Sequence, residues 1–258
     1  MESRIKAKFN LEGKVAIVTG ASKGIGESMV RGFAEHGAKV IVSSRNQEAV
    51  DKVAASLKKD GLEANGIACH VGDSEQLKNL INKTLEHYGG VDILVNNAAT
   101  NPVFTPLTGI ESDAFDKIMN VNLKACWELG NLCHPIMAKR GGGSVINIAS
   151  VEGLKPSFGL GVYSISKAAL IMLTKSQAKE WGPDKIRSNA ICPGLIQTKF
   201  SSAIWQNEKI LNQFVKHLPL SKMAQPDEMA GLACYLASEA SSYTTGGVYT
   251  SDGGYMVA

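Results

Sequence analysis

Short apolar runs alternate with longer amphipathic segments along almost the whole chain, and this order leaves few possible folds. Seven runs have the length of strands, the third weaker than the others, at residues 14–19, 40–43, 64–71, 91–95, 144–148, 186–191 and 247–250. The segments between them carry the apolar spacing of helices, at residues 25–36, 47–59, 74–88, 112–139, 162–181 and 226–238. Continuously apolar strands are typical of a parallel sheet that is buried on both faces.

The regular β/α order predicts a single domain over residues 1–258. The chain has no internal repeat, low-complexity segment or linker, and 44% of its residues are hydrophobic, which is enough for a substantial core. The alternation favours an α/β fold, a doubly wound parallel sheet of seven strands with helices on both faces. Ligands of such sheets bind outside the carboxyl ends of the strands.

Composition and charge argue against several classes of partner. The net charge is +3, with both signs mixed along the chain and no basic block suited to nucleic acid. No apolar run approaches the roughly 20 residues that span a bilayer, and the N-terminal stretch lacks the apolar core of a signal peptide. Five scattered cysteines and five histidines show no metal-ligand spacing. We therefore expect a cytoplasmic protein with reduced thiols and no metal, membrane or nucleic-acid partner.

A glycine-rich stretch, TGASKGIG at residues 19–26, joins the first predicted strand to the first helix. Its three glycines allow a tight turn and let backbone N–H groups approach a pyrophosphate, which the helix N-terminus also attracts. A glycine-rich turn without a ligand has a similar composition, but the position between strand and helix favours a dinucleotide site. The residues expected to contact the cofactor here are Gly20, Ser22, Lys23, Gly24, Ile25 and Gly26.

The end of the second predicted strand indicates which dinucleotide binds. Many NAD-binding folds place Asp or Glu there to hold the ribose hydroxyls, whereas this chain reads Ser44-Arg45-Asn46. A 2′-phosphate on the ribose is attracted by Arg45 and by Lys23 in the glycine loop. Arg45 also suits an ordinary surface position, although a cation is unfavourable at the start of a helix. The pattern predicts NADP(H) rather than NAD(H).

Tyr163 and Lys167 lie four residues apart in a predicted helix and therefore share one face. A phenol normally loses its proton near pH 10, and a neighbouring ammonium lowers that pKa towards neutral pH. This is the chemistry that a general acid needs. The pair alone is weak evidence, since Tyr and Lys at this spacing also occur on helix surfaces.

Six ordered motifs together resemble the short-chain dehydrogenase/reductase family over about residues 11–254. They are TGASKGIG, NNAA at residues 96–99, Asn122, Ser150, the Tyr163–Lys167 pair and Pro193-Gly194. The pattern is most similar to the NADP-dependent carbonyl and retinal reductases, partly through CHVG at residues 69–72. The resemblance implies a Rossmann-type fold, with a cofactor half at about residues 11–150 and a catalytic and substrate half at about residues 150–258.

The resemblance also implies a catalytic set of four residues. Tyr163 is expected to act as general acid and base, and Lys167 to lower its pKa and hold the nicotinamide ribose. Ser150 is expected to hydrogen-bond the substrate oxygen, and Asn122 to anchor a water that links Lys167 to solvent. On its own, Ser150 also suits a capping serine and Asn122 a helix-surface amide.

Further cofactor contacts follow from the resemblance. Asn97 and Ala98 are expected to line the adenosine ribose, while Asn96 ties adjacent strands together. The family usually has Asp where this chain has His70, beside Val71, so the contact to the adenine amino group is in doubt. Ala99 replaces the usual glycine of the NNAG motif, with a small expected effect. The segment expected to wrap the nicotinamide contributes Pro193, Gly194, Ile196 and Thr198.

The segments beyond the strand ends supply mainly large apolar side chains. Besides Ser150 and Tyr163, the expected substrate residues are Phe104, Leu154, Phe158 and Trp205. They favour an apolar or aromatic carbonyl compound over a sugar phosphate or a carboxylate-bearing acid, although each also suits the core or a subunit interface. Residues 200–217 lack strong periodicity and suit a mobile substrate lid. Relatives are commonly tetramers, and the wide apolar arcs of helices 112–139 and 162–181 suit a homotetramer.

The resulting hypothesis is an NADP(H)-dependent oxidoreductase that reversibly reduces a ketone or aldehyde to an alcohol by hydride transfer. Two alternatives remain open, an NAD-dependent sugar or hydroxysteroid dehydrogenase and a non-catalytic dinucleotide-binding scaffold. The Ser150, Tyr163 and Lys167 set argues against the scaffold, because a pure binder has no need of an acid–base pair.

Overall fold

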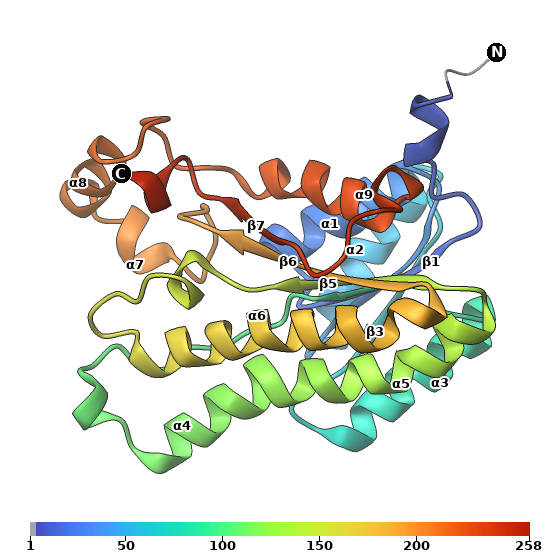
Figure 1. Ribbon diagram of the computed structural model, residues 1–258, viewed down its shortest axis with the longest axis horizontal. Helices are drawn as coiled ribbons and strands as arrows, with labels where there is room; N and C mark the ends of the chain where they lie inside the picture. The colour runs from blue at the N-terminus through green and yellow to red at the C-terminus, as the bar shows by residue number, and fades with distance from the viewer. Residues whose placement is uncertain (1–3) are drawn as a thin grey trace.

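The computed structural model describes residues 4–258, in which a single parallel sheet runs through the centre (Figure 1). The strand order is β3-β2-β1-β4-β5-β6-β7, and every neighbouring pair is parallel. The strands are Val15–Thr19 (β1), Lys39–Ser44 (β2), Ala64–Ala68 (β3), Ile93–Asn96 (β4), Gly143–Ile148 (β5), Ile186–Pro193 (β6) and Val248–Ser251 (β7). The prediction of a doubly wound α/β domain with seven strands is confirmed.

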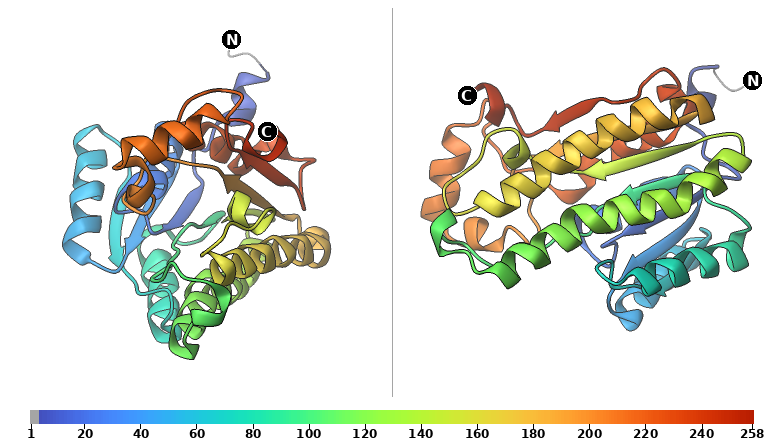
Figure 2. Two further views of the ribbon diagram at one scale, coloured as in Figure 1. Left: turned by 90° about the vertical axis from the view of Figure 1, so that its left-hand side faces the viewer. Right: turned by 60° about the horizontal axis from the view of Figure 1, so that its bottom comes forward.

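Helices cover both faces of this sheet (Figure 2). One face packs against α1 (Gly24–Glu35), α2 (Gln47–Lys59) and α9 (Ala230–Ala237), and the other packs against α3 (Ser74–Tyr88), α5 (Ala125–Lys139) and α6 (Gly161–Trp181). Successive strand residues point to opposite faces. The β1 residues Ala16 and Val18 accordingly pack against α1, while Ile17 joins the cluster on the other face.

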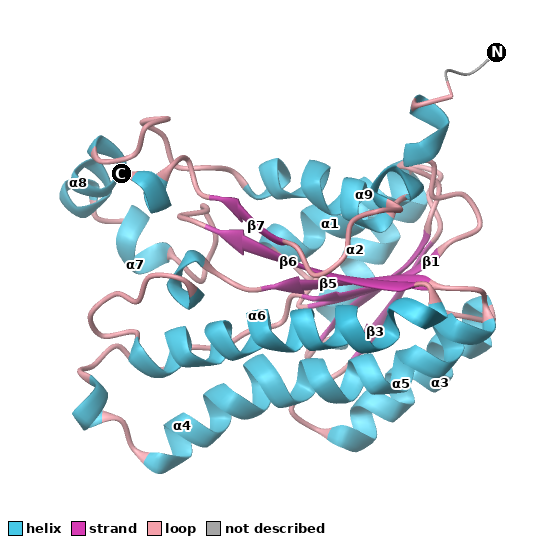
Figure 3. Cartoon of the chain, viewed as in Figure 1, coloured by secondary structure: helices cyan, strands magenta, loops and turns pink. Residues whose placement is uncertain are grey.

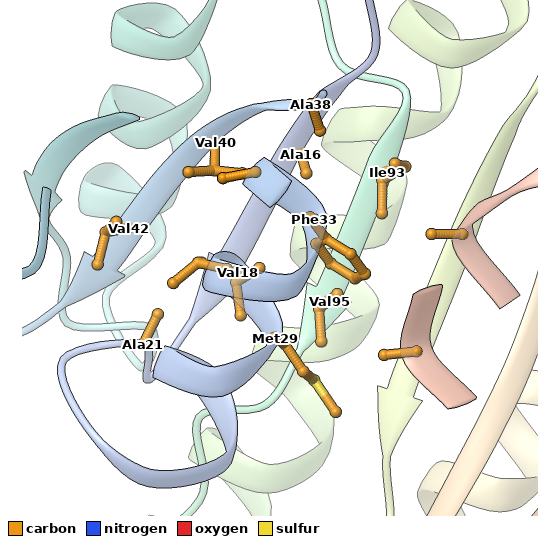
Figure 4. Close-up of a cluster of buried hydrophobic side chains, with 14 of the residues drawn as sticks. Ala16, Val18, Ala21, Met29, Phe33, Ala38, Val40, Val42, Ile93 and Val95 are labelled. Atoms are coloured by element: carbon orange, nitrogen blue, oxygen red, sulfur yellow. The ribbon is translucent and has the colours of Figure 1, made fainter. Parts of the chain in front are cut away.

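The larger core cluster lies between β1, β2, β4 and helix α1 (Figure 4). Phe33 and Met29 of α1 are fully buried against Val18 and Val95, and apolar spacing along the helix places both side chains on the same face. This packing fixes α1 against the sheet. Because the glycine loop leads into α1, the same packing fixes the position of that loop.

The long helical region that the sequence predicts at residues 112–139 is one continuous helix with an irregular turn (Figure 3). It consists of α4 (Ser112–Met119), a π-helical turn at Asn120–Lys124, and α5. Pro135 lies inside α5, which continues to Lys139, the predicted end of the region. A proline removes only the bond to the carbonyl four residues earlier, here that of the solvent-exposed Asn131, where water can replace it.

Two other predicted segments differ from the structure. Strand β3 stops at Ala68 rather than at residue 71, because the chain turns at Cys69–Gly72 towards α3. Residues 200–217, for which no regular element is predicted, contain two short helices, α7 (Ser202–Trp205) and α8 (Glu208–Lys216). Among residues 4–258, no helix is both long and apolar enough to cross a membrane.

The strand order reverses between β1 and β4, which lie side by side although two strands separate them in the chain. Connections leave these two strands in opposite directions, so a crevice is expected beyond their carboxyl ends. Asn96, at the end of β4, donates a 2.8 Å hydrogen bond from Nδ2 to Oδ1 of Asn147 in β5. It therefore ties adjacent strands, as the sequence predicts.

Candidate active site and cofactor site

Helix α6 carries both members of the Tyr163–Lys167 pair into the interior. Tyr163 is 8% exposed and Lys167 is 2% exposed. The Lys167 ammonium lies 5.7 Å from the centre of the Tyr163 ring, and its Nζ donates a 2.7 Å hydrogen bond to the Ile148 carbonyl at the end of β5. The structure thus places the pair together at the carboxyl edge of the sheet, not on a solvated helix surface.

Burial controls the protonation of both groups. Burial raises the pKa of Tyr163, a hydrogen bond from Ser150 opposes that rise, and the nearby Glu152 carboxylate adds to it. Burial lowers the pKa of Lys167 to about 8, partly offset by the neighbouring Cys126 and Cys192 thiols. The expected lowering of the Tyr163 pKa by Lys167 is therefore not seen here, because desolvation of the phenol dominates.

Ser150 follows β5 and serves two roles. Its Oγ accepts a 3.1 Å hydrogen bond from the Glu152 backbone N–H, so it caps the short 3-10 turn Val151–Gly153. The Ser150 hydroxyl also acts on Tyr163, whose pKa it lowers. The capping role and the position beside the phenol, which the sequence presents as alternatives, coexist in the structure.

Asn122 lies in the π-helical turn and is fully buried. Its Oδ1 accepts from the Thr100 N–H at 2.8 Å, and its Nδ2 donates to the Thr100 carbonyl at 3.0 Å and to Ser166 Oγ at 3.1 Å. Both amide protons are thus used. Asn122 fastens the segment after β4 to helix α6, which makes the surface-amide interpretation wrong, while the water relay to Lys167 stays a prediction.

The glycine loop is held against the segment that follows β4. Gly20 has a φ of +65°, and a Cβ placed on it would lie 2.9 Å from Ala98 Cα. A Cβ on Gly26 would lie 2.6 Å from both Asn97 Nδ2 and the Gly20 carbonyl. Asn97 Nδ2 itself donates to the Thr19 and Gly20 carbonyls at 2.9 and 3.1 Å. Asn97 therefore stabilises the glycine loop, because its side-chain N–H groups bind the loop carbonyls rather than pointing into the crevice.

The start of α1 fits an anionic ligand. Its N-cap, Lys23, makes no side-chain capping bond, so no side chain from that position occupies the first N–H groups of the helix. The Lys23 side chain is exposed, and Ser22 beside it is half-buried. Gly24 approaches Thr198, since a Cβ on Gly24 would lie 3.3 Å from Thr198 Cγ2. The glycine loop and the segment expected to hold the nicotinamide therefore face each other.

The end of β2 presents the expected cation. Arg45 is exposed and has no hydrogen bond or ion pair within residues 4–258, and Ser44 beside it is half-buried. Asn46 instead caps α2, with its Oδ1 accepting from the Ala49 N–H at 2.8 Å.

The loop after β3 holds the residues expected near the adenine. His70 is half-buried, and its backbone N–H donates to Gln76 Oε1 at 2.8 Å. Val71 is buried.

The segment after β6 is held from two sides. The Gly194 N–H donates to the Ser251 carbonyl at 3.0 Å, and Ile196 forms an isolated bridge with Ala224. Trp205, an expected substrate residue, donates from its indole Nε1 to the Thr198 carbonyl at 2.8 Å. The polar edge of Trp205 therefore fixes α7 to the expected nicotinamide segment.

The other expected substrate residues lie at the surface. Phe104 is 73% exposed, Phe158 is 79% exposed and Leu154 is 42% exposed. Phe104 packs on Gly159, where an added Cβ would lie 2.8 Å from the ring. These side chains form an apolar rim and do not line an enclosed pocket in this structure.

Two residues near Tyr163 were not predicted as part of the site. The Phe200 ring lies 5.7 Å from the Tyr163 ring, centre to centre, and is 57% exposed. Glu152 accepts from the N–H and Oγ of Ser157 at 2.8 and 2.7 Å, which fixes the loop beside Tyr163. Phe200 is separated from Tyr163 by 37 positions, so only its place at the start of the predicted lid could have indicated this contact.

No group of three or more His, Cys, Asp or Glu side chains among residues 4–258 could hold a metal ion. Burial raises the pKa of all five cysteine thiols, which are free and buried, at Cys69, Cys126, Cys133, Cys192 and Cys234.

Comparison with known proteins gives consistent matches over nearly the whole chain. The family model described as Enoyl-(Acyl carrier protein) reductase matches residues 20–256. The chain is 42% identical to dehydrogenase/reductase SDR family member 4 of Oryctolagus cuniculus, over 98% of this chain and 97% of that relative. It is 40% identical to the protein of the same name from Caenorhabditis elegans, over 94% and 95%.

Two solved structures have a similar backbone. A gluconate 5-dehydrogenase from Burkholderia cenocepacia in complex with NADP and tartrate gives a TM-score of 0.93 at 32% identity, covering 97% of this chain and 98% of that one. A 7α-hydroxysteroid dehydrogenase complexed with NADH and 7-oxo glycochenodeoxycholic acid gives a TM-score of 0.93 at 31% identity, covering 98% of both chains.

Proposed function

Since the chain belongs to the short-chain dehydrogenase/reductase family and is an oxidoreductase with a dinucleotide-binding fold, we propose that it is an NADP(H)-dependent carbonyl reductase. The reaction is the reversible reduction of a ketone or aldehyde to an alcohol. One observation carries the proposal. Tyr163, Lys167 and Ser150 gather at the carboxyl edge of the sheet on which the glycine loop lies.

The residues of this chain divide the work of the reaction. The reduced nicotinamide supplies the hydride. Burial keeps the Tyr163 phenol protonated, as a general acid requires when the carbonyl oxygen becomes an alcohol. Ser150 stabilises negative charge that develops on that oxygen. Lys167 contributes a buried cation beside the phenol and a donor for the nicotinamide ribose.

The cofactor site extends from the glycine loop to the ends of β2 and β6. Gly20 and Gly26 let the loop pack closely on Asn97 and Ala98, so the N–H groups at the start of α1 would hold the pyrophosphate. Thr198, which faces Gly24, would border the nicotinamide. The exposed Arg45 and Lys23 cations support NADP(H), because a 2′-phosphate needs positive charge where NAD-specific relatives place a carboxylate. The division into a cofactor half and a substrate half near residue 150 belongs to this proposal.

The substrate is proposed to be an uncharged, apolar or aromatic carbonyl compound. Phe104, Leu154 and Phe158 give the rim an apolar character. The Glu152 carboxylate acts electrostatically on Tyr163, and the same negative charge disfavours a substrate carboxylate. A sugar or hydroxysteroid dehydrogenase is the second candidate. Its support is the similarity of the backbone to structures named as a gluconate 5-dehydrogenase and a 7α-hydroxysteroid dehydrogenase.

Assembly and location complete the proposal. We expect a homotetramer in the cytoplasm, with exposed side chains of α4, α5 and α6 at subunit contacts, including Phe115, Trp127 and Met172. Sedimentation velocity at micromolar concentration measures the assembly directly, and a monomer at that concentration would remove the tetramer from the proposal.

A cofactor and substrate panel tests the proposed activity. Uncharged aromatic ketones and aldehydes, a keto sugar acid and an oxosteroid are each offered with NADPH and with NADH, and loss of the reduced nicotinamide absorbance is followed. We expect the aromatic carbonyl compounds with NADPH to give the highest kcat/KM. A preference for the keto sugar acid or oxosteroid with NADH would replace the proposal by the second candidate.

The Arg45→Asp variant tests the cofactor argument separately. The substitution removes the cation and adds a charge that repels the 2′-phosphate, so NADPH should bind at least about tenfold more weakly while NADH binding changes little. Fluorescence titration of both reduced cofactors measures this. Equal weakening of both would exclude Arg45 as the 2′-phosphate contact.

A further inference from the structure

The C-terminal segment, residues 251–257, contacts two stretches of the connection between β6 and α9. In Figure 1 its last turn lies beside α8, far along the chain from the catalytic helix. The Leu220 N–H donates to the Gly253 carbonyl at 3.1 Å, and a Cβ on Gly254 would lie 2.5 Å from Pro219. A Cβ on Gly194 would lie 2.7 Å from Asp252 Cα. The segment thus contacts this connection at its start, Gly194, and again at Pro219 and Leu220.

Tyr255 gives this segment its contacts with the helices and loops around the substrate. Its ring stacks on that of Phe214 in α8, with 5.3 Å between centres and 13° between planes. The Lys155 ammonium, from the loop that follows Ser150, lies 5.1 Å from the centre of the same ring. One aromatic ring therefore connects α8, the Ser150 loop and the C-terminus.

Helix α8 depends on such contacts, because it has no fully buried residue. A helix of nine residues has little stability of its own in water. The turn around Tyr255 is itself fixed, since Asp252 accepts hydrogen bonds from the Gly254 and Met256 N–H groups at 2.9 and 3.0 Å. The Tyr255 ring therefore has a fixed position, and the more weakly packed α8 is held in place where Phe214 stacks on it.

We propose that Tyr255 is a positioning residue that holds α8 over the substrate crevice through the Phe214 ring and fixes the Ser150 loop through Lys155. Its aromatic ring contacts Phe214 and Lys155, so it acts on substrate binding through these two neighbours. The effect on turnover rests on the proposed function, whereas the effect on α8 does not.

Limited trypsin digestion tests the structural part without reference to activity. The lid segment, residues 200–217, offers cleavage after Lys209 and Lys216, and cleavage requires α8 to open. Tyr255→Ala removes the stacked pair and the cation–π contact, and should raise the cleavage rate in α8 about five- to tenfold. Tyr255→Phe keeps the ring and should restore the wild-type rate.

Tyr243→Ala is the matched control, because that tyrosine is fully exposed and takes part in no aromatic stack among residues 4–258. It should leave cleavage in α8 unchanged. If Tyr255→Ala folds poorly, Lys155→Ala removes only the cation–π contact, and α8 cleavage should then rise by about two- to fivefold. Unchanged cleavage in both variants would overturn the proposal.

Steady-state kinetics tests the functional part. Tyr255→Ala should raise KM for the carbonyl substrate about five- to tenfold with a smaller change in kcat, because the crevice is covered less of the time. The dissociation constant of NADPH should not change, and Tyr255→Phe should recover KM. A matching loss of NADPH binding, or no recovery in Tyr255→Phe, would contradict a positioning role. If the wild-type protein reduces no carbonyl compound, the proposed function fails while the digestion result still decides the role of Tyr255.

Discussion

At the residue scale, Phe200 is the large side chain whose ring lies beside Tyr163, the proposed general acid. Its ring centre lies 5.7 Å from that of Tyr163 while 57% of its surface is exposed, so it borders both Tyr163 and solvent. Phe200→Ala removes an apolar surface that an aromatic substrate would contact. We expect KM for aromatic ketones to rise about tenfold, an amount typical of one aromatic contact, with NADPH binding unchanged.

Tyr243→Ala is the control for Phe200, because Tyr243 is fully exposed and makes no aromatic contact with Tyr163 among residues 4–258. Steady-state assays over a series of ketones of increasing size compare the two variants. An equal rise of KM in both would show that Phe200 has no special position over Tyr163.

Because Lys167 is buried, we expect the stability of the folded protein to increase with pH in the alkaline range. Burial lowers its pKa from 10.5 to about 8, so between these values the unfolded chain binds more protons than the folded protein. The free energy of unfolding of the wild type, relative to Lys167→Met, should therefore rise with pH from about 8 to 10.5, by up to on the order of 3 kcal/mol. Urea denaturation of both proteins at several pH values measures the difference.

Lys175→Met, at an exposed position of the same helix, is the control for this pH series. Its difference from the wild type should be nearly constant with pH. A constant or falling difference for Lys167→Met would mean that Lys167 is not desolvated in the folded protein.

Contacts within one helix could be predicted from the sequence, whereas contacts between distant segments could not. The sequence predicts Tyr163 and Lys167 because they lie within one helical turn, where local geometry fixes their proximity. Neither the Phe200 contact nor the double role of Ser150 follows from spacing, because both depend on how distant segments meet. The Tyr163 pKa differs from expectation for the same reason, since burial is a property of the folded chain.

At the scale of elements, the sequence of the glycine loop is tightly restricted by the residues packed against it. A Cβ on Gly26 would lie 2.6 Å from Asn97 Nδ2 and from the Gly20 carbonyl, so Gly26→Ala must displace backbone. We expect it to lower the free energy of unfolding by about 1–3 kcal/mol, as overpacking does, and to weaken NADPH binding. Urea denaturation and fluorescence titration measure the two effects.

Gly182→Ala is the matched substitution for Gly26→Ala, because a Cβ there meets nothing within 4 Å and its backbone is helical. Its stability should stay within about 0.5 kcal/mol of the wild type. If Gly26→Ala behaved like Gly182→Ala, the loop would have more room than the structure gives it.

The elements themselves were largely predictable, and the exceptions have physical causes. Continuous apolar runs and helical periodicity predict every strand of the sheet and helices α1, α2, α3 and α6 to within a few residues. The π-helical turn at Asn120–Lys124 is not predictable from periodicity, because one widened turn leaves the apolar spacing on either side almost intact. Helix α8 was missed although Ile210, Leu211, Phe214 and Val215 have the spacing of one helical face, so the description of residues 200–217 as lacking periodicity was wrong.

At the scale of the whole molecule, the sequence pattern predicts the class of fold but not the order of the strands. The alternation of strands and helices along the chain requires parallel strands joined by helical crossovers, but many strand orders in the sheet are compatible with it. The observed order places β1 beside β4 and thereby brings the glycine loop next to Asn97, and it also brings α6 to the same edge. The candidate site exists only through that order.

The most direct test of the account is the Tyr163→Phe variant, which removes one hydroxyl group from a ring that remains buried. We expect kcat for carbonyl reduction to fall at least about 100-fold, as for loss of a general acid, while the dissociation constant of NADPH stays within about twofold. Tyr243→Phe, at a fully exposed position, should change neither quantity. Unchanged turnover in Tyr163→Phe would contradict the proposed acid–base role and with it the central claim.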